Sequence, residues 1–412
     1  MMSDPAGIRI TDYNYSLPAD RIAQFPLKER DGSKLLIHHQ GRISEDIFSN
    51  VADYLSENSL LVFNDTKVIR ARIYFSTPTG ARVEIFCLEP VLPGPEIQAA
   101  FHQTGASTWK CLVGNLKRWK TGILVNEIIR DGGVNRLYAE RISTDPEGNC
   151  LIAFRWDPPS KSFAEILDLA GLIPLPPYIH RPTESSDAQR YQTIYAANDG
   201  SVAAPTAGLH FTGPLLEKIA QKGIDCVKVT LHVGIGTFRP VSAEQIGDHV
   251  MHHEKLVVSR KTIEHLLKNP DRPVFAVGTT SARTLESLYW LGVRLIREGS
   301  GMPGAIPQWY PYQPEHADAI PVKHSLEALL HHLERNQLDE YSGETQLMIV
   351  PGYSFKILSG LITNFHMPQS TLLLLVAALV GENWKQAYAY ALANGFRFLS
   401  YGDSCIFFIQ GK

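Results

Sequence analysis

Cysteine is scarce in this sequence of 412 residues: only five are present, and no two of them form a Cys-x-x-Cys pair. An odd number without a pairing motif argues against both a disulfide framework and a cysteine zinc site. Free thiols are typical of a reducing compartment, so the sequence predicts a cytoplasmic protein. The five residues are Cys87, Cys111, Cys150, Cys226 and Cys405.

Long hydrophobic runs are also missing. The most apolar stretch, TLLLLVAALVG from Thr371 to Gly381, is too short to span a bilayer and predicts a buried helix. The N-terminus lacks the apolar core of a secretory signal. A soluble protein with no membrane partner is therefore expected.

Neither sign of charge dominates the sequence. The formal net charge is −3 at pH 7, which is not the strongly basic footprint of a dedicated nucleic-acid-binding module. A local basic patch remains compatible with this total. The stretch LKRWK, Leu116 to Lys120, offers one with a stackable Trp119, although a solvated hairpin is the simpler interpretation.

Familiar catalytic motifs are absent as well. The sequence has no Gly-x-x-x-x-Gly-Lys-Ser/Thr, no Gly-x-Ser-x-Gly and no His-Glu-x-x-His, and GIGTFR lacks the third glycine of a dinucleotide fingerprint. These absences leave a P-loop enzyme, a serine hydrolase and a zinc protease unsupported. A metal site at His249, His252 and His253 would need a convergence that the sequence does not show.

The segments that are present differ in texture along the chain. Short β-like pieces separated by Gly, Pro and Asn turns fill residues 76–157 and predict an inserted all-β barrel domain. Strands and helices alternate in the rest, which predicts an α/β catalytic domain with a largely parallel or mixed sheet. This domain is discontinuous and comprises residues 1–75 and 158–412.

Within the α/β part, several elements can be placed from periodicity and capping signals. A short helix is expected at PADRIAQ (18–24), strands at 225–234, 272–280 and 360–366, and a helix at 212–223 capped by Thr212. Residues 299–321 are expected to form a long loop, and 326–344 a charged, exposed helix with a trailing loop.

Polar residues cluster where these strands end. His232 follows one strand, Thr279 to Ser281 join a strand to a helix, and Asn364 and His366 end another. Ligands of parallel sheets bind at the carboxyl ends of strands, so these groups are candidates for one cleft. The alternatives are ordinary ones: Thr280 or Ser281 as helix caps, His366 as a structural histidine, and Arg283 with Glu286 as an i,i+3 surface pair.

Nine motifs follow one another in a specific order. They are LLVFNDTKVIRARI, GLIPLPPYIHRP, YQTIYA, SVAAPTAGLHFT, VTLHVGIGTFRPV, HVMHHE, AVGTTSARTLES, PGYSFKILSGLITNFHMPQSTLLLLV and FRFLSYGDS. This series, from about Tyr13 to Asp403, closely resembles the S-adenosylmethionine:tRNA ribosyltransferase-isomerases of the queuosine pathway.

The resemblance implies a reaction and a set of partners. The family transfers the ribosyl part of S-adenosylmethionine to 7-aminomethyl-7-deazaguanine in the anticodon of tRNA and isomerises it, giving epoxyqueuosine, adenine and methionine. S-adenosylmethionine is therefore expected as the ribosyl donor, no metal is expected, and a monomer that binds the tRNA anticodon region is expected. The small residues of SVAAPTAGLHFT would then let the backbone approach the donor, with Ala203 to His210 as the floor of the pocket and Gly208 supplying unusual backbone angles.

Roles for the site residues follow from the reaction. A base must remove a proton beside the sulfonium, and histidine is the usual proton carrier near neutral pH. We expect this role for His232 first, His210 second and His366 third. Asp65 would bind a ribose hydroxyl or the amine, and Lys67 would balance its charge.

The donor and the target base need further contacts. Thr279, Thr280 and Arg283 are expected to hold the methionine carboxylate at the helix N-terminus. Tyr401 and Asp403 are expected to contact adenine or the target base. The other residues predicted to bind substrate are Thr206, Gly208, Gly234, Gly236, Glu286 and Asn364.

Some positions depart from the family pattern. Arg70 stands where the family usually has Pro, Thr79 replaces a Gly, and Ser359 stands where Asp is common. Two alternatives therefore stay open: ribosyl transfer to a small 7-deazapurine, and a non-catalytic RNA-binding relative. Weak binding of tRNA that does not depend on salt would favour the first.

Overall fold

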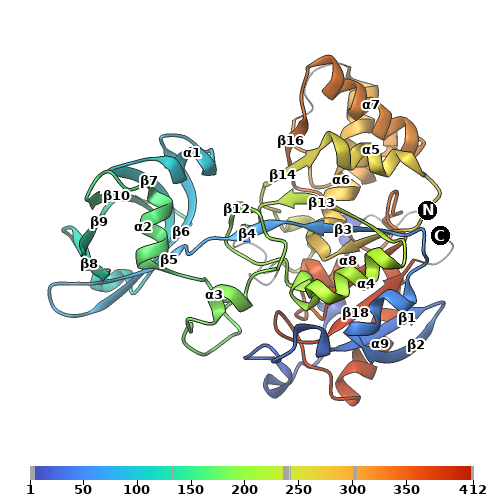
Figure 1. Cartoon of the computed structure of the whole chain (residues 1–412), viewed down its shortest axis with the longest axis horizontal. Helices are drawn as coiled ribbons and strands as arrows, with labels where there is room; N and C mark the ends of the chain where they lie inside the picture. Colours follow the sequence, from blue (N-terminus) through green and yellow to red (C-terminus); the bar gives the residue numbers. More distant parts are fainter. Residues whose placement is uncertain are drawn as a thin grey trace.

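The computed structural model describes residues 5–130, 133–234, 241, 243–299, 304–316, 318 and 320–409. The chain forms a large α/β body and a smaller β body beside it (Figure 1). Among the described residues, no helix is long and apolar enough to cross a membrane.

A mixed sheet of nine strands forms the centre of the large body. The four strands β13, β3, β15 and β17 are mutually parallel, and antiparallel pairs extend the sheet on both sides. In spatial order the strands are β16 (Glu340–Thr345), β14 (Glu254–Ser259), β13 (Asp225–Leu231), β3 (Leu60–Asn64), β15 (Val274–Val277), β17 (Gly360–Asn364), β18 (Ser404–Phe408), β1 (Lys34–His39) and β2 (Arg42–Ile47). The predicted mixed sheet is confirmed.

Both faces of β3, β15 and β17 are covered, which explains why their sequences are mostly apolar. Successive side chains of a strand point to opposite faces. Leu60 and Val62 of β3 therefore join a core with the helices on one side, and Leu61 and Phe63 join a second core on the other. The first core includes α6 (Thr279–Glu298), α8 (Thr371–Val380) and α9 (Asn383–Ala393), and the second includes α4 (Gly213–Gln221) and the 3-10 helix Phe48–Tyr54.

Three predicted elements differ from the structure. PADRIAQ forms only the 3-10 turn Ala19–Arg21. The expected exposed helix is α7 (Val322–Arg335), whose apolar side chains pack against α6 and α5 (Arg260–Lys268). The expected trailing loop is strand β16, which pairs with β14. Thr212 does cap α4, because its side chain accepts from the Leu215 N–H.

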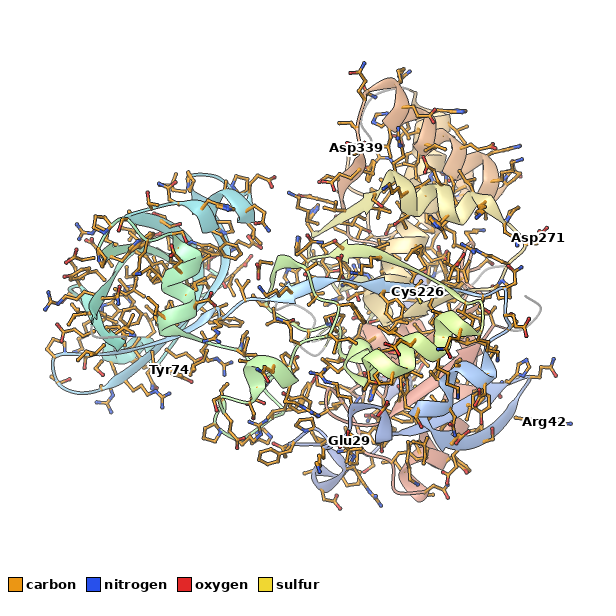
Figure 2. The ribbon with its side chains drawn as sticks, viewed as in Figure 1. Glu29, Arg42, Tyr74, Cys226, Asp271 and Asp339 are labelled. Carbon is orange, nitrogen blue, oxygen red and sulfur yellow. The ribbon has the colours of Figure 1, made fainter. Side chains whose placement is uncertain are left out.

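The smaller body is an antiparallel barrel of six strands. Its strands run in the order β5, β6, β7, β10, β9, β8, and the pairing of Ser76 with Val125 closes it. Side chains fill its interior (Figure 2). The strands are β5 (Arg72–Ser76), β6 (Arg82–Leu92), β7 (Ala106–Gly114), β8 (Leu124–Arg130), β9 (Gly133–Thr144) and β10 (Cys150–Asp157), with helices α1 (Ile97–His102) and α2 (Phe163–Ala170) and the short strand β11 (Gly171–Leu172) against them. The predicted barrel is confirmed, and the boundaries at 76 and 157 stay a prediction.

All five cysteines are free, and Cys226 of β13 is the exposed one (Figure 2). In the barrel, Trp119 is buried and donates to the Gly122 carbonyl, so it is not placed to stack on RNA.

The segments that link the two bodies form a parallel pair of short strands and a short helix (Figure 1). These are β4 (Thr66–Val68), β12 (Asn198–Ser201) and α3 (Asp187–Arg190).

Candidate active site

A cavity opens at the carboxyl ends of β15 and β17, as the topology predicts. Its volume is about 820 Å³ including the space open to solvent. Of the predicted floor, Ala203 to His210, the residues Ala203 to Ala207 form part of the cavity wall and Gly208 to His210 do not line it. Six of the predicted site residues line it: Thr206, Thr279, Thr280, Arg283, Asn364 and His366.

The N-terminus of α6 faces this cavity without a side-chain cap. Gly278 precedes the helix with φ of +88°, a conformation that favours glycine, and no side chain caps the first turn. Thr280 Oγ1 is buried and has no hydrogen-bond partner among the described residues. The predicted capping role of Thr280 is therefore wrong, and the free N–H groups of a 20-residue helix remain open to an anion.

Arg283 lies one turn into α6 and is buried. Its Nε donates to the Leu347 carbonyl at 3.2 Å, and its Nη1 forms an ion pair with Glu254 of β14. Nη2 has no partner among the described residues. The Nη2 amino group of a fixed guanidinium is thus left to bind a carboxylate.

Glu286 does not pair with Arg283, so the expected surface pair is wrong. The α6 helix is buried on all sides in this region, and the Glu286 side chain points to the loop before β17. There it accepts hydrogen bonds from Tyr353 Oη and from the backbone N–H groups of residues 356, 357 and 358 at 2.7–3.1 Å. It does not line the cavity.

His210 lies behind the cavity wall and contacts the wall through Asn364. Ser33 Oγ is 2.8 Å from its Nδ1, and Asn364 Nδ2 is 3.1 Å from its Nε2. An amide nitrogen only donates, so Nε2 accepts and the neutral ring carries its proton on Nδ1. Asn364 Oδ1 has no partner among the described residues and is left for a ligand donor.

His366 is the predicted histidine that lines the cavity. Its Nε2 is 3.1 Å from Thr363 Oγ1, and its main chain is fixed by Tyr15 and Tyr388. Burial lowers the pKa of His366 to about 3 and, as the main cause, that of His210 to about 4. Both rings are therefore neutral in the folded protein near pH 7.

These two histidines make stability depend on pH. Both have a pKa below the ordinary value of 6.5, so between that pH and the folded pKa the unfolded chain binds more protons. The contribution of these neutral histidines to the free energy of unfolding is fully present above about pH 6.5. It is lost as the pH drops toward about 4, and the loss is on the order of 3 kcal/mol for His210 alone. Urea unfolding from about pH 7.5 to about pH 4 should show this loss. His210→Gln should reduce it and the exposed control His324→Gln should not; equal pH dependence in all three proteins would contradict the prediction.

His232 and Asp65 lie together, but in a different hollow. Asp65 Oδ1 accepts from Thr230 Oγ1 at 2.7 Å and Asn198 Nδ2 at 3.0 Å, and His232 Nδ1 is 3.0 Å from Thr66 Oγ1. Burial and the nearby Lys255 lower the pKa of His232, although Asp65 opposes this. The structure therefore does not bring His232, His210 and His366 to one cavity.

Other predicted residues are placed as follows. Lys67 pairs with Asp199 at 3.0 Å beside the barrel, and Gly234 lines a second cavity next to the first. Gly236 lies outside the described residues. No three His, Cys, Asp or Glu side chains converge as a metal site in the described part of the chain.

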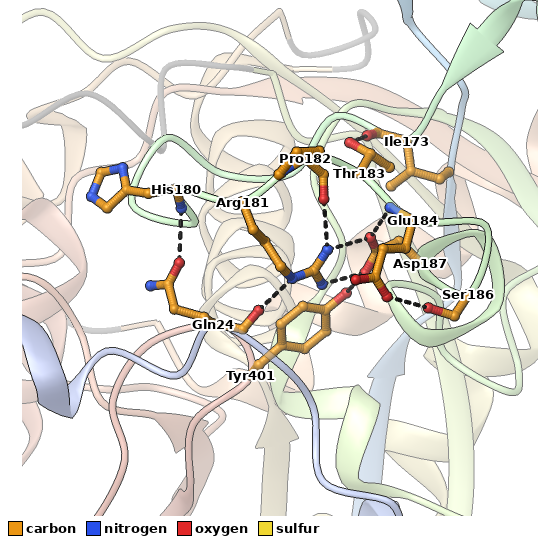
Figure 3. A network of polar contacts seen from close by, with 10 residues as sticks. All are labelled: Gln24, Ile173, His180, Arg181, Pro182, Thr183, Glu184, Ser186, Asp187 and Tyr401. Carbon is orange, nitrogen blue, oxygen red and sulfur yellow. Dashed lines mark hydrogen bonds and ion pairs between the residues drawn. The ribbon is translucent and has the colours of Figure 1, made fainter.

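Tyr401 and Asp403 are engaged within the protein rather than facing the cavity. Asp403 accepts from the backbone N–H groups of Lys34 and Arg397, and Tyr401 Oη donates to Asp187 at 2.9 Å. Asp187 also binds Arg181 through two bonds of 2.7 Å, in a network that joins the segment after the barrel to the C-terminal turn (Figure 3). The structure does not bring either residue to the cavity at the carboxyl ends of β15 and β17, which we call the main cavity.

This network has a consequence for the cavity wall. Tyr178, three residues before Arg181, bonds Ser400, one residue before Tyr401, at 2.6 Å. Both Tyr178 and Ser400 line the cavity. The buried ion pair between Arg181 and Asp187 therefore holds this wall in place from behind, and no sequence motif indicates this pair.

Gly208 is needed for packing and not for contact with a ligand. A Cβ atom there would lie 2.0 Å from Tyr195 Oη and 2.8 Å from Thr193 Cγ2, and its φ is not positive. The expected unusual backbone angle is therefore wrong, and Gly208 does not line the cavity.

A substitution pair tests this role. Gly208→Ala should lower the free energy of unfolding by about 1–3 kcal/mol, because the methyl group overpacks the site. Gly213→Ala is the matched control, since nothing lies within 4 Å of its Cβ position. Equal stability of the two variants in urea denaturation would refute the packing role.

The three departures from the family pattern lie away from the main cavity. Arg70 contacts Asp168 of the barrel helix, Thr79 lies in a barrel turn, and Ser359 Oγ accepts from the Val274 N–H at the opposite end of β17. None of them lines the cavity. The departures therefore leave the candidate site itself intact.

Sequence reasoning missed two groups that the structure brings to the site. Glu254 ends the motif HVMHHE and binds Arg283, which only the pairing of distant segments reveals. Gln369 and Leu399 have φ of +54° and +68° and flank residues of the cavity wall. Positive φ at non-glycine residues has no sequence signature, but such strain clusters at functional sites.

Comparisons with known proteins relate this chain to a described family. The profile of a family described as "Queuosine biosynthesis protein" matches residues 10–407. The S-adenosylmethionine:tRNA ribosyltransferase-isomerase of Trichlorobacter lovleyi is 38% identical over 402 residues, covering 96% of this chain and 99% of that protein. The protein of that name from Halothermothrix orenii is 37% identical over 408 residues, covering 97% and 99%. A crystal structure of S-adenosylmethionine tRNA ribosyltransferase from Thermotoga maritima is 29% identical, with a TM-score of 0.46 over 96% of this chain and 99% of that chain.

Proposed function

Because this chain belongs to the family of queuosine biosynthesis proteins, we propose that it is an S-adenosylmethionine:tRNA ribosyltransferase-isomerase and that the main cavity binds the donor. The ribosyl part of S-adenosylmethionine is transferred to 7-aminomethyl-7-deazaguanine in the anticodon region of tRNA, and adenine and methionine leave. The observation that carries this assignment is the set of buried, unpartnered groups around one cavity: Thr280 Oγ1, Arg283 Nη2 and Asn364 Oδ1. Buried polar groups are normally satisfied, so unsatisfied ones in a cavity point to a polar ligand.

The carboxylate of the donor has a complementary place at α6. The free N–H groups of the first turn, Thr280 and the Nη2 group of Arg283 together supply hydrogen-bond donors and positive charge. The small residues Ala203 to Ala207 form an apolar wall that accommodates ribose and adenine. Asn364 Oδ1 is left to accept a hydrogen bond from a ribose hydroxyl or an adenine amine.

His366 is our candidate for the group that removes the proton beside the sulfonium. It lines the cavity, whereas His210 lies behind the wall and His232 in a separate hollow. Its low pKa keeps the ring unprotonated. When Nε2 donates to Thr363 Oγ1, the lone pair of Nδ1 is left to accept the proton.

Adenine release tests the function. The protein is mixed with S-adenosylmethionine and tRNA that carries 7-aminomethyl-7-deazaguanine, and adenine and the nucleosides are followed by chromatography and mass. Adenine together with a nucleoside of the mass of epoxyqueuosine is expected. Adenine without that nucleoside would assign the donor chemistry to another acceptor, such as a small 7-deazapurine. Absence of both in a folded sample would refute the enzyme and favour an RNA-binding role.

A further inference from the structure

A second cavity adjoins the main one and is not used by the chemistry described so far. The two share Arg283 and Leu372, so Arg283 lies at their junction. The second cavity has a volume of about 600 Å³, including space open to solvent. One end is charged, His249, His252 and Thr371 add polar groups to the lining, and the remainder is apolar.

The charged end consists of Glu254 and Arg283. Both side chains are buried, with exposed fractions of 6% each, and they are joined through Glu254 Oε2 and Arg283 Nη1. The other atoms of the two groups are Glu254 Oε1, to which no described residue donates, and Arg283 Nη2, which is unpartnered. A buried cation and anion side by side, each with one atom free, are complementary to the carboxylate and ammonium groups of an α-amino acid.

The apolar part matches a flexible thioether chain. Met251, Met348, Ile349 and Leu375 line it. Methionine side chains adapt to irregular ligands and make favourable contacts with other polarisable groups. The backbone of Met251 is held in place, because Gln308 accepts from its N–H at 2.9 Å and Gln346 donates to its carbonyl at 2.8 Å.

We infer that the second cavity binds L-methionine once its bond to the ribose has broken, with the carboxylate still on Arg283 at the junction of the two cavities. In the intact donor the sulfur is bonded to the ribose in the main cavity, so the thioether enters the second cavity only as part of the leaving amino acid. Glu254 binds the α-ammonium group through Oε1 and also positions Arg283, which binds the carboxylate. The inference rests on the proposed function, since it places the leaving amino acid of that reaction. The inference assigns Glu254 as a specificity-determining residue, because it binds the ammonium group and not the thioether.

Binding of amino-acid analogues tests this site without any turnover. Isothermal titration of the intact protein with L-methionine and with 4-(methylthio)butanoate, which lacks the ammonium group, compares the two ligands directly. L-methionine is expected to bind about tenfold or more tightly, because its ammonium group gains a charged hydrogen bond. Equal affinity of the two ligands, or no binding of either, would overturn the inference.

The variant Glu254→Gln separates the two roles of this residue. It should reduce the affinity for L-methionine about tenfold and leave that for 4-(methylthio)butanoate within about twofold. Glu344→Gln on the adjacent strand β16 is the control, since that carboxylate is exposed and pairs with His253. Equal losses for both ligands would mean that Glu254 acts only through Arg283 and would overturn its role in ammonium binding.

Competition by S-adenosylmethionine separates this inference from the proposed function. If L-methionine binds and S-adenosylmethionine displaces it, the two ligands compete for Arg283, as inferred. If L-methionine binds but is not displaced, the inference that the leaving amino acid stays on the arginine that holds the donor fails, whatever the result of the adenine assay. If adenine is released while neither methionine ligand binds, the proposed function stands and the second cavity has no part in it.

Discussion

Replacement of Glu286 by alanine is expected to lower the free energy of unfolding by about 3–6 kcal/mol, the largest effect on stability that we predict. Its fully buried carboxylate accepts three backbone N–H bonds and one from Tyr353 Oη. Alanine would leave these N–H groups without a partner in the interior, at a cost of about 1–3 kcal/mol for each unsatisfied donor. These N–H groups belong to the loop that leads directly into β17. Displacement of this loop would therefore also disturb the cavity.

Urea denaturation measures this effect, and a second glutamate on the same helix provides the control. Glu298 is half-exposed and pairs with Arg294 near the end of α6, so Glu298→Ala should cost no more than about 1 kcal/mol. The free energy of unfolding of Glu286→Gln should lie between those of wild type and Glu286→Ala. The glutamine carbonyl oxygen still accepts hydrogen bonds, but its NH₂ group faces other donors. A loss of less than about 1 kcal/mol for Glu286→Ala would contradict the role in holding the loop.

Much of the fold follows from local patterns, which is why it could be predicted. The strands β3, β15 and β17 are mostly apolar because both of their faces are covered. The barrel strands are separated by turns of Gly, Pro and Asn, and Thr212 and Pro214 mark the start of α4. Each of these signals depends on residues only a few positions apart.

The partners in the site could not be predicted in this way, because they are distant in sequence. The spacing of Arg283 and Glu286 suggested a surface pair, but the helix is buried there and each residue binds a different segment. His210 bonds Ser33 and Asn364, which are separated from it by 177 and 154 positions. Tertiary packing decides such contacts, and residue type and spacing do not encode them.

The separation of the histidines has a similar cause. His232 follows β13 and His366 follows β17, and two strands, β3 and β15, lie between those strands in the sheet. The rule that ligands bind at strand ends correctly predicted the edge of the sheet. It does not specify which side of that edge a side chain faces, and His232 faces Thr66 and Gly200 instead of the cavity.

Arg283→Lys should lower kcat/KM for S-adenosylmethionine about 100-fold, mostly through a higher KM. Lysine keeps the positive charge but has one compact ammonium group in place of a fork. In Arg283, Nη1 pairs with Glu254, Nε donates to the Leu347 carbonyl and Nη2 is left for the donor carboxylate. A single ammonium group cannot make all three contacts at the same time. Because Arg283 touches the bound amino-acid end and not the reacting carbon, kcat should fall less than the affinity does.

Arg294→Lys on the same helix is the matched control for this experiment. Arg294 pairs with the half-exposed Glu298 and lines neither cavity, so its replacement should leave kcat/KM within about twofold. Salt-dependent binding of tRNA should be unchanged in Arg283→Lys, since this side chain is buried and paired with Glu254. An Arg283→Lys enzyme with wild-type KM would show that the donor carboxylate is bound by other groups. A variant that lost kcat alone, with KM unchanged, would place Arg283 at the reacting centre and not at the amino-acid end of the donor.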